Sequence, residues 1–173
     1  MRVIGGEFRS RRLKSLAGLE TRPTPDRLRE ALFNVLAARV ADSVFIDVYA
    51  GTGAVGIEAL SRGARRAIFI EKHRGAVGVI RDNLAALGLE ARAEVLAGKA
   101  APALERVSAD IVFIDPPYEA QREYELALNA LAGGESKLVI AQHASRVPPA
   151  PEYGRLRRYR VLRQGDNSLS FYE

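Results

Sequence analysis

The sequence predicts an α/β protein built on a doubly wound, mostly parallel sheet. From residue 44 onward, short apolar segments alternate with amphipathic segments, which is typical of repeated β-α-β units. A glycine-rich turn at residues 51–53 follows the first apolar segment. Another apolar run, Ile111–Ile114, leads directly into Asp115 and two prolines. Such a run favours a strand buried on both faces, and Pro116 must end it because proline lacks an N–H group.

The individual elements follow from these patterns in order. The expected strands cover residues 44–48, 66–70, 91–96, 111–115 and 137–142. The expected helices run from the glycines to about residue 62, and over residues 75–87, 100–106 and 121–131. Residues 148–151 are a proline-rich connector, and residues 155–163 and 168–172 are two strands with no helix between them. These last strands predict an antiparallel hairpin at the end of the sheet.

The first 43 residues differ from this core. Residues 2–16 alternate loosely and predict a β-hairpin with a basic face. A helix is expected to follow, with Thr24 as its cap and Pro25 at its first position. Apolar residues then recur at helical spacing as far as residue 40, which leaves Arg27, Arg29 and Glu30 away from the core. We expect one domain over residues 1–173, divided into this N-terminal part (1–43) and the core (44–173).

Composition narrows the classes of function. The chain has no Cys and two His, which argues against a disulfide framework and against a thiolate or histidine-rich metal site. It has no apolar run of membrane-spanning length and no signal-peptide core, so we expect a soluble cytoplasmic protein. The net charge of +5 lies entirely in residues 1–40, which hold nine Arg or Lys and four Asp or Glu. That concentration indicates an arm that faces a polyanion.

The glycine-rich turn predicts a cofactor site. Gly51, Gly53 and Gly56 have the spacing of a dinucleotide-binding loop, and Glu71 follows Gly51 by 20 residues, as expected of a ribose-binding acid. A nicotinamide dinucleotide and S-adenosylmethionine both remain possible from this pattern. Asp47 would repel a pyrophosphate but suits the ammonium group of the methionine moiety, so S-adenosylmethionine is favoured. The alternative for Asp47 is that it only fixes the turn.

The segment Asp115-Pro116-Pro117-Tyr118 presents acceptors and an aromatic ring at the end of a strand. The Asp115 carboxylate and the Pro116 carbonyl can accept the two N–H groups of an amine, and Tyr118 can stack on the planar group that carries it. Catalysis would then consist mainly of orientation and placed charge. Asp115 can also take the proton that is released.

Here the residues carry a family resemblance. Asp115-Pro116-Pro117-Tyr118 resembles the signature of class I amino-methyltransferases, which have a Rossmann-like fold, and residues 47–53 resemble their cofactor loop. Nearly the whole chain resembles the RsmD-type methyltransferases of bacterial 16S rRNA. The further matching segments are residues 2–6, 22–34 and 50–64.

That resemblance implies transfer of a methyl group from S-adenosylmethionine to the exocyclic N2 amine of a guanine in 16S rRNA, alone or within a small ribosomal subunit or assembly intermediate. A monomer is expected. It implies catalytic roles for Asp115, Pro116 and Tyr118. The expected cofactor contacts are Thr24, Asp47, Ala50, Gly51, Thr52, Gly53 and Glu71. The expected RNA contacts are Arg9, Arg11, Arg12, Lys14, Arg22 and Arg27, with Arg157 and Arg158 as further candidates.

Two departures and three alternatives remain. Gly98-Lys99 stands where many relatives carry an acid, so the adenine contact is unassigned, and Gln142-His143 replaces another common acid. We interpret His143 as structural. The alternatives are methylation of adenine N6, methylation of a protein glutamine, and RNA binding without catalysis. The basic arm argues against the protein substrate, and the intact Asp47 and Asp115 segments argue against a non-catalytic module.

Overall fold

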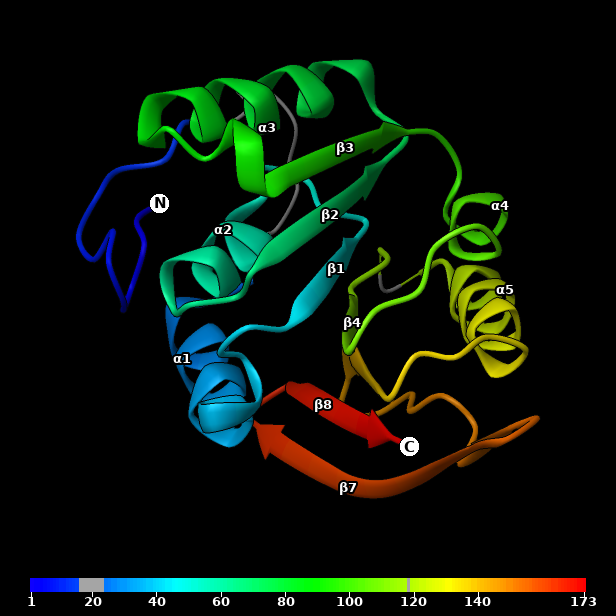
Figure 1. The fold of residues 1–173 in the computed structure, drawn as a ribbon. Helices are drawn as coiled ribbons and strands as arrows, with labels where there is room; N and C mark the ends of the chain where they lie inside the picture. Colours follow the sequence, from blue (N-terminus) through cyan, green and yellow to red (C-terminus); the bar gives the residue numbers. More distant parts are fainter. Residues whose placement is uncertain (16–23, 118) are drawn as a thin grey trace.

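The computed structural model describes residues 1–15, 24–117 and 119–173. Its sheet has eight strands in the order β3-β2-β1-β4-β5-β8-β7-β6 (Figure 1). The parallel strands are β1 (Val44–Val48), β2 (Arg66–Glu71), β3 (Ala93–Ala97), β4 (Ile111–Ile114) and β5 (Leu138–Ala144). The antiparallel strands are β8 (Asn167–Tyr172), β7 (Leu156–Gln164) and β6 (Glu152–Tyr153). The predicted doubly wound sheet with a C-terminal antiparallel hairpin is therefore confirmed.

Helices cover both faces of this sheet. On one face lie α1 (Asp26–Leu36), α2 (Ala54–Ser61) and α3 (Arg74–Leu87), and on the other lie α4 (Ala100–Leu104) and α5 (Gln121–Ala132) (Figure 1). Short 3-10 turns occupy Ala37–Arg39 and Glu90–Arg92. No helix among the described residues is long and apolar enough to cross a membrane.

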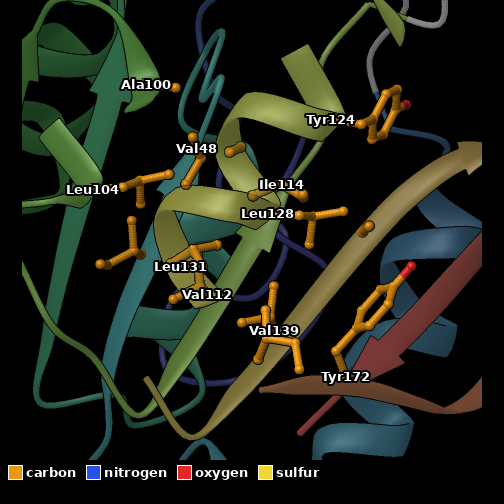
Figure 2. Close-up of a cluster of buried hydrophobic side chains, with 14 of the residues drawn as sticks. Val48, Ala100, Leu104, Val112, Ile114, Tyr124, Leu128, Leu131, Val139 and Tyr172 are labelled. Carbon is orange, nitrogen blue, oxygen red and sulfur yellow. The ribbon is translucent and has the colours of Figure 1, made fainter. Parts of the chain in front are cut away.

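The α4–α5 side of the core is built by alternate residues of the central strands. Figure 2 shows Val112 and Ile114 of β4 pointing toward Leu128 and Leu131 of α5, and all four are fully or almost fully buried. The opposite face is also apolar: Phe45 of β1 stacks on Phe33 of α1, with ring centroids 6.1 Å apart. Because both faces are covered, the central strands read as continuous apolar runs.

The order of the strands creates the crevice that the site uses. The chain winds from β1 outward to β3, then returns so that β4 pairs with the other edge of β1. Ligands of such sheets bind beyond the carboxyl ends of the strands, at this point of reversal. We call the side of the sheet beyond the carboxyl ends of the parallel strands the carboxyl edge, and the opposite side the amino edge.

The N-terminal arm, residues 1–15, differs from the expected hairpin. Arg2 and Arg12 form one isolated antiparallel bridge, and most residues between them are turns and bends rather than two regular strands. The arm is held by tertiary contacts, since Val3 and Leu13 pack in the same apolar cluster as residues of α2 and α3. Its ladder could not extend because Gly6 and Ser10 have positive φ angles.

Helix α1 corrects three expectations. Pro25, not Thr24, precedes the helix as its cap, and no side chain caps it. The helix ends at Leu36, because Ala37 leaves the helical conformation with φ 37°. Arg29 was expected to be exposed but is fully buried. Its Nη2 donates to the Arg2 carbonyl at 2.7 Å and to Asp26 Oδ1 at 3.0 Å. Both bonds are made by Nη2, and among the described residues Nε and Nη1 have no hydrogen-bond partner.

The C-terminal part contains a strand that the sequence pattern did not reveal. Glu152–Tyr153 pairs with β7 directly after the proline-rich connector. Its two residues are too few for a periodic signal, and buried tertiary contacts hold it in place. The Tyr153 hydroxyl donates to the Glu125 carboxylate at 2.8 Å and accepts the Ala150 N–H at 2.9 Å.

Candidate active site

Two carboxylates lie side by side at the point where the winding of the sheet reverses. Val48, which ends β1, pairs with Ile114, which ends β4, so Asp47 and Asp115 lie at the ends of neighbouring strands. Phe45 and Phe113 pack with α1, and side chains two residues apart share a face of a strand. Asp47 and Asp115 therefore point toward the α1–α2 side.

The glycine loop connects β1 to α2 in a compact turn. The Gly53 N–H donates to the Ala50 carbonyl at 2.7 Å. Gly51 has φ 56°, and a Cβ at this position would meet no protein atom within 4 Å. Glycine thus allows the left-handed conformation that the turn needs, and, in the described part of the chain, the space beside Gly51 is free of protein atoms. At residue 56 glycine is needed for packing instead, because a Cβ there would collide with the Phe69 ring of β2.

Asp47 holds this loop in place. Its carboxylate is 2% exposed, and Oδ2 accepts the Gly56 N–H at 2.8 Å. Burial raises the pKa of Asp47 well above its usual range, although the Gly56 N–H favours the charged form. A buried carboxylate with such a pKa gains from a cationic ligand. The arrangement therefore fits the ammonium group of a methionine moiety while it also fixes the turn.

Glu71 fixes the loop from the neighbouring strand. At the end of β2, its Oε2 accepts the Gly51 N–H at 2.9 Å and its Oε1 accepts the His73 N–H at 2.8 Å. Each carboxylate oxygen can accept a second hydrogen bond. Glu71 can therefore receive ribose hydroxyl groups directly beside the open side of Gly51.

Asp115 is partly buried and is oriented by a residue 91 positions away. Thr24 Oγ1 donates to Asp115 Oδ2 at 3.0 Å. Burial raises the pKa of Asp115 to about 7, and the hydrogen bond from Thr24 opposes this rise. Thr24 was predicted to contact the cofactor; the structure shows that it contacts the predicted catalytic carboxylate. Among the described residues no hydrogen bond uses the second oxygen of Asp115, so it can accept one from a ligand.

Pro116 is buried beside Asp115, and its carbonyl lies 3.5 Å from the Tyr124 hydroxyl. That hydroxyl makes a shorter bond, 2.8 Å, to the Gln142 carbonyl. The Pro116 carbonyl thus keeps capacity to accept another hydrogen. Tyr118, predicted to stack on the substrate, lies outside the described residues.

Tyr49 is a site residue that the sequence patterns missed. It adopts φ 63°, a left-handed conformation that is uncommon for a bulky residue. Its hydroxyl donates to Glu123 Oε2 at 2.9 Å, which ties the glycine loop to α5. Burial and the Glu123 carboxylate raise the pKa of Tyr49 above its usual range, so the hydroxyl remains a donor. The sequence around Tyr49 contains no pattern that predicts a positive φ at a tyrosine.

The predicted RNA contacts of the arm do not gather around Asp115. The tip of the arm lies at the amino-edge end of α2, where the Glu7 N–H donates to the Ser61 carbonyl at 2.8 Å. Lys14 pairs with Asp82 of α3 at 3.0 Å, and Arg11 Nη2 donates to the Ala86 carbonyl at 3.2 Å. The other described cations in this prediction are exposed: Arg9, Arg12 and Arg27. Arg22 lies outside the described residues.

His143 is a buried structural residue, as interpreted from the sequence. Its Nδ1 lies 2.9 Å from the Ala144 carbonyl and its Nε2 lies 2.8 Å from Ser170 Oγ. Burial lowers the pKa of His143. The ring therefore links β5 to β8 in its neutral form and takes no part in the carboxylate site.

Comparison with known proteins agrees with this geometry. The family model described as conserved hypothetical protein 95 matches residues 1–173. The chain is 42% identical over 120 residues to ribosomal RNA small subunit methyltransferase D of Escherichia coli (strain K12), covering 68% of this chain and 60% of that protein. It is 32% identical over 187 residues to YlbH of Bacillus subtilis (strain 168), covering 100% of this chain and 98% of that protein.

Solved structures show the same fold. The structure of yhhF from Escherichia coli matches with a TM-score of 0.86 and 34% identity, covering 99% of this chain and 96% of that chain. An RNA methyltransferase from Salinibacter ruber, in complex with S-adenosyl-L-homocysteine, matches in fold with a TM-score of 0.63 at 17% identity, covering 86% of this chain and 91% of that chain. The chain therefore belongs to the family described as conserved hypothetical protein 95, the RsmD family of S-adenosylmethionine-dependent methyltransferases.

Proposed function

We propose that this protein transfers a methyl group from S-adenosylmethionine to the exocyclic N2 amine of a guanine in 16S ribosomal RNA. One observation carries the chemistry: the Asp115 carboxylate is held by Thr24 beside the glycine loop, with one oxygen left for a donor. The nucleic acid substrate is supported by the names of the relatives, such as ribosomal RNA small subunit methyltransferase D.

Three residues would hold the two ends of the cofactor. Asp47 receives the ammonium group, Glu71 receives the ribose hydroxyls, and the open side of Gly51 admits the chain between them. When bound, S-adenosylmethionine supplies a methyl group on a positively charged sulfur. The Gly51 N–H already donates to Glu71, and the Gly56 N–H already donates to Asp47. The loop thus needs little rearrangement to receive the ligand, which lowers the cost of binding.

Asp115 and Pro116 would bind the amine. One amine hydrogen bonds to the second oxygen of Asp115 and the other bonds to the Pro116 carbonyl. These two bonds turn the nitrogen lone pair away from the ring and toward the methyl group. Tyr118 is proposed, from the sequence alone, to stack on the base. The contribution of the protein is orientation and fixed negative charge near a nitrogen that becomes positive.

The same carboxylate can remove the proton that the nitrogen must lose. Its pKa of about 7 lies near neutral pH, where a group exchanges protons most effectively. On transfer the nitrogen would gain the methyl group that S-adenosylmethionine supplies, with S-adenosylhomocysteine as the leaving group, and Asp115 would accept the proton that the nitrogen loses and pass it to water. Asp115 must be deprotonated at the start of each cycle.

The test is methyl transfer to unmodified 16S rRNA, both as naked transcript and as assembled small subunit, followed by nucleoside analysis. We expect label from the cofactor in N2-methylguanosine. N6-methyladenosine would replace the proposed base, and methylated glutamine in ribosomal protein would replace the proposed substrate class. Calorimetry with S-adenosylhomocysteine separates these outcomes from a protein that does not bind the cofactor.

A further inference from the structure

Six cationic side chains surround the candidate active site along the carboxyl edge. Each lies in or next to the segment that follows a strand, or at the end of β7 beside the carboxyl end of β5. We call them the carboxyl-edge cations: Lys72, Arg74, Lys99, Arg122, Arg146 and Arg163. They come from both halves of the chain, so their grouping is a product of the topology.

These cations are exposed. Among the described residues, none of them has an ion pair, a hydrogen bond or a ring contact with its side chain. The exposed acids on the same edge, among the described residues, include Asp26, Glu119 and Asp166. The positive side chains therefore outnumber the negative ones at the surface that surrounds Asp115.

Exposed cations at the amino edge are arranged differently. Three of them each face a carboxylate: Arg65 with Asp42 at 3.7 Å, Arg66 with Glu94 at 2.5 Å, and Lys137 with Asp110 at 2.8 Å. Arg106, in the loop before β4, has no ion pair within the described part of the chain. Exposed cations without an ion pair also occur elsewhere in the described part of the chain, among them Arg9, Arg12 and Arg81. The carboxyl-edge cations differ from these because the topology groups them around the two carboxylates.

We propose that the carboxyl-edge cations bind the phosphates on both sides of the nucleotide whose base enters the active site. This inference rests on the proposed function and assigns the path of the RNA. Lys72, Arg74 and Lys99 lie beyond β2 and β3, on one side of the carboxylates. Arg122 and Arg146 follow β4 and β5, and Arg163 lies near the end of β7, on the other side.

The dimensions fit a strand that crosses the whole edge. Neighbouring strands are about 4.8 Å apart, so the six steps from β3 to β7 span roughly 30 Å. A target base held at Asp115, near the middle of this span, has room for flanking nucleotides in both directions. Single-stranded segments suit this path, since their bases are already free to leave a stack. The basic arm, with its tip at the amino-edge end of α2, is then a separate contact.

The experiment measures binding of unmodified 16S rRNA transcript at several salt concentrations. One variant carries Arg122→Gln, Arg146→Gln and Arg163→Gln, and a second carries Lys72→Gln, Arg74→Gln and Lys99→Gln. The matched control carries Arg65→Gln, Arg66→Gln and Lys137→Gln, which removes the same charge from the amino edge. The far-ultraviolet circular dichroism spectrum and the melting temperature show that each variant retains its fold.

We expect each carboxyl-edge variant to reduce the slope of log K against log salt by about 2, because each single-strand phosphate contact contributes about 0.7. The control should leave the slope unchanged. Equal slopes in all three variants and the wild type would overturn the inference, as would a loss shared equally by the control. If the wild type binds RNA and the carboxyl-edge variants weaken that binding, but no methyl group is transferred, then the proposed reaction is refuted and the RNA path is not.

Discussion

The two edges of the sheet differ in whether their exposed charged side chains form ion pairs. At the amino edge, Lys137 and Asp110 neutralise each other at 2.8 Å. At the carboxyl edge, Asp47 is buried and Asp115 is partly buried, burial raises both pKa values, and the carboxyl-edge cations lack ion pairs within the described residues. Ion pairs therefore form on this protein but, in the described part of the chain, not among the cations that surround the proposed ligand site. We expect the charges of the bound ligands to pair with these cations and with the two carboxylates.

The largest expected effect comes from removing the carboxylate of Asp115. Asp115→Ala should reduce kcat by about 10²–10³-fold or more, the loss typical of one placed electrostatic group. Affinity for S-adenosylhomocysteine should persist. Asp110→Asn is the matched change at the amino edge, and it should leave kcat unchanged. Both are checked by single-turnover methylation of rRNA together with calorimetry, and a turnover by Asp115→Ala near the wild-type rate would refute the role assigned to this residue.

A smaller effect is expected at Asp47. Asp47→Asn keeps an acceptor for the Gly56 N–H and removes the charge. We expect about a tenfold loss of affinity for S-adenosylhomocysteine, equal to about 1.4 kcal/mol. Affinity for 5′-methylthioadenosine, which lacks the amino-acid end, serves as the internal control and should not change. A similar loss for both ligands would mean that Asp47 acts only by fixing the loop.

Thr24→Val tests the contact that crosses from the N-terminal part to β4. The donor is lost without a change of shape, and since this hydrogen bond lowers the pKa of Asp115, the pKa should rise. Because the deprotonated form is required, the acid limb of kcat/KM against pH, expected near pH 7 in the wild type, should move to higher pH. The rate should fall several-fold at pH 6 and less at pH 8.5. Thr52→Val, in the glycine loop, is a comparison that should not move the limb.

Asp115 should also leave a signature in stability. Its folded pKa of about 7 lies above the unfolded value of about 3.9, so its contribution is fully present below pH 4 and is lost as pH rises through 7. Asp115→Asn removes that loss. The melting temperature of the variant relative to the wild type should therefore increase between pH 5 and pH 8. Parallel curves would show that Asp115 is not desolvated in solution.

The smallest effect is expected from the paired charges of the amino edge. Lys137→Ala breaks an exposed ion pair with Asp110 and should lower the free energy of unfolding by about 1 kcal/mol or less. Urea denaturation measures this change, and methylation should proceed at the wild-type rate. A large loss of activity would show that the two edges are coupled and that the contrast between them is incomplete.

Much of the fold was predictable because its signals are local. Apolar runs such as Ile111–Ile114 mark buried strands, and Gly88, with φ 67°, ends α3 at the predicted residue. The glycine loop and Glu71 also have fixed spacing in the chain, so their position at neighbouring strand ends follows from one β-α-β unit. The two-residue strand β6 was missed, since so short a segment has no period.

Contacts between distant segments were not predictable. Thr24 was predicted to cap the helix and to contact the cofactor, but its hydroxyl bonds to Asp115, and the helix that follows it packs on the face of the sheet against Phe45 and Phe113. Arg29 was expected to be exposed because it falls outside the apolar spacing of the helix, but it is buried, and its Nη2 donates to the Arg2 carbonyl and to Asp26. The contacts of Thr24 with Asp115 and of Arg29 with the Arg2 carbonyl depend on how separate elements pack, whereas Asp26 precedes Arg29 by three residues, which is helical spacing.

Charge shows the division most clearly. The sequence by itself determined the winding of the sheet, the cofactor loop, the carboxylate at Asp115 and a net charge of +5 in the first 40 residues. It also assigned no net charge to the remainder. Only the tertiary structure decided that Arg65, Arg66 and Lys137 meet acids at the amino edge, whereas the six carboxyl-edge cations have no ion pair among the described residues. The reason is that sequence counts charges along the chain, whereas electrostatic interactions depend on distance in space.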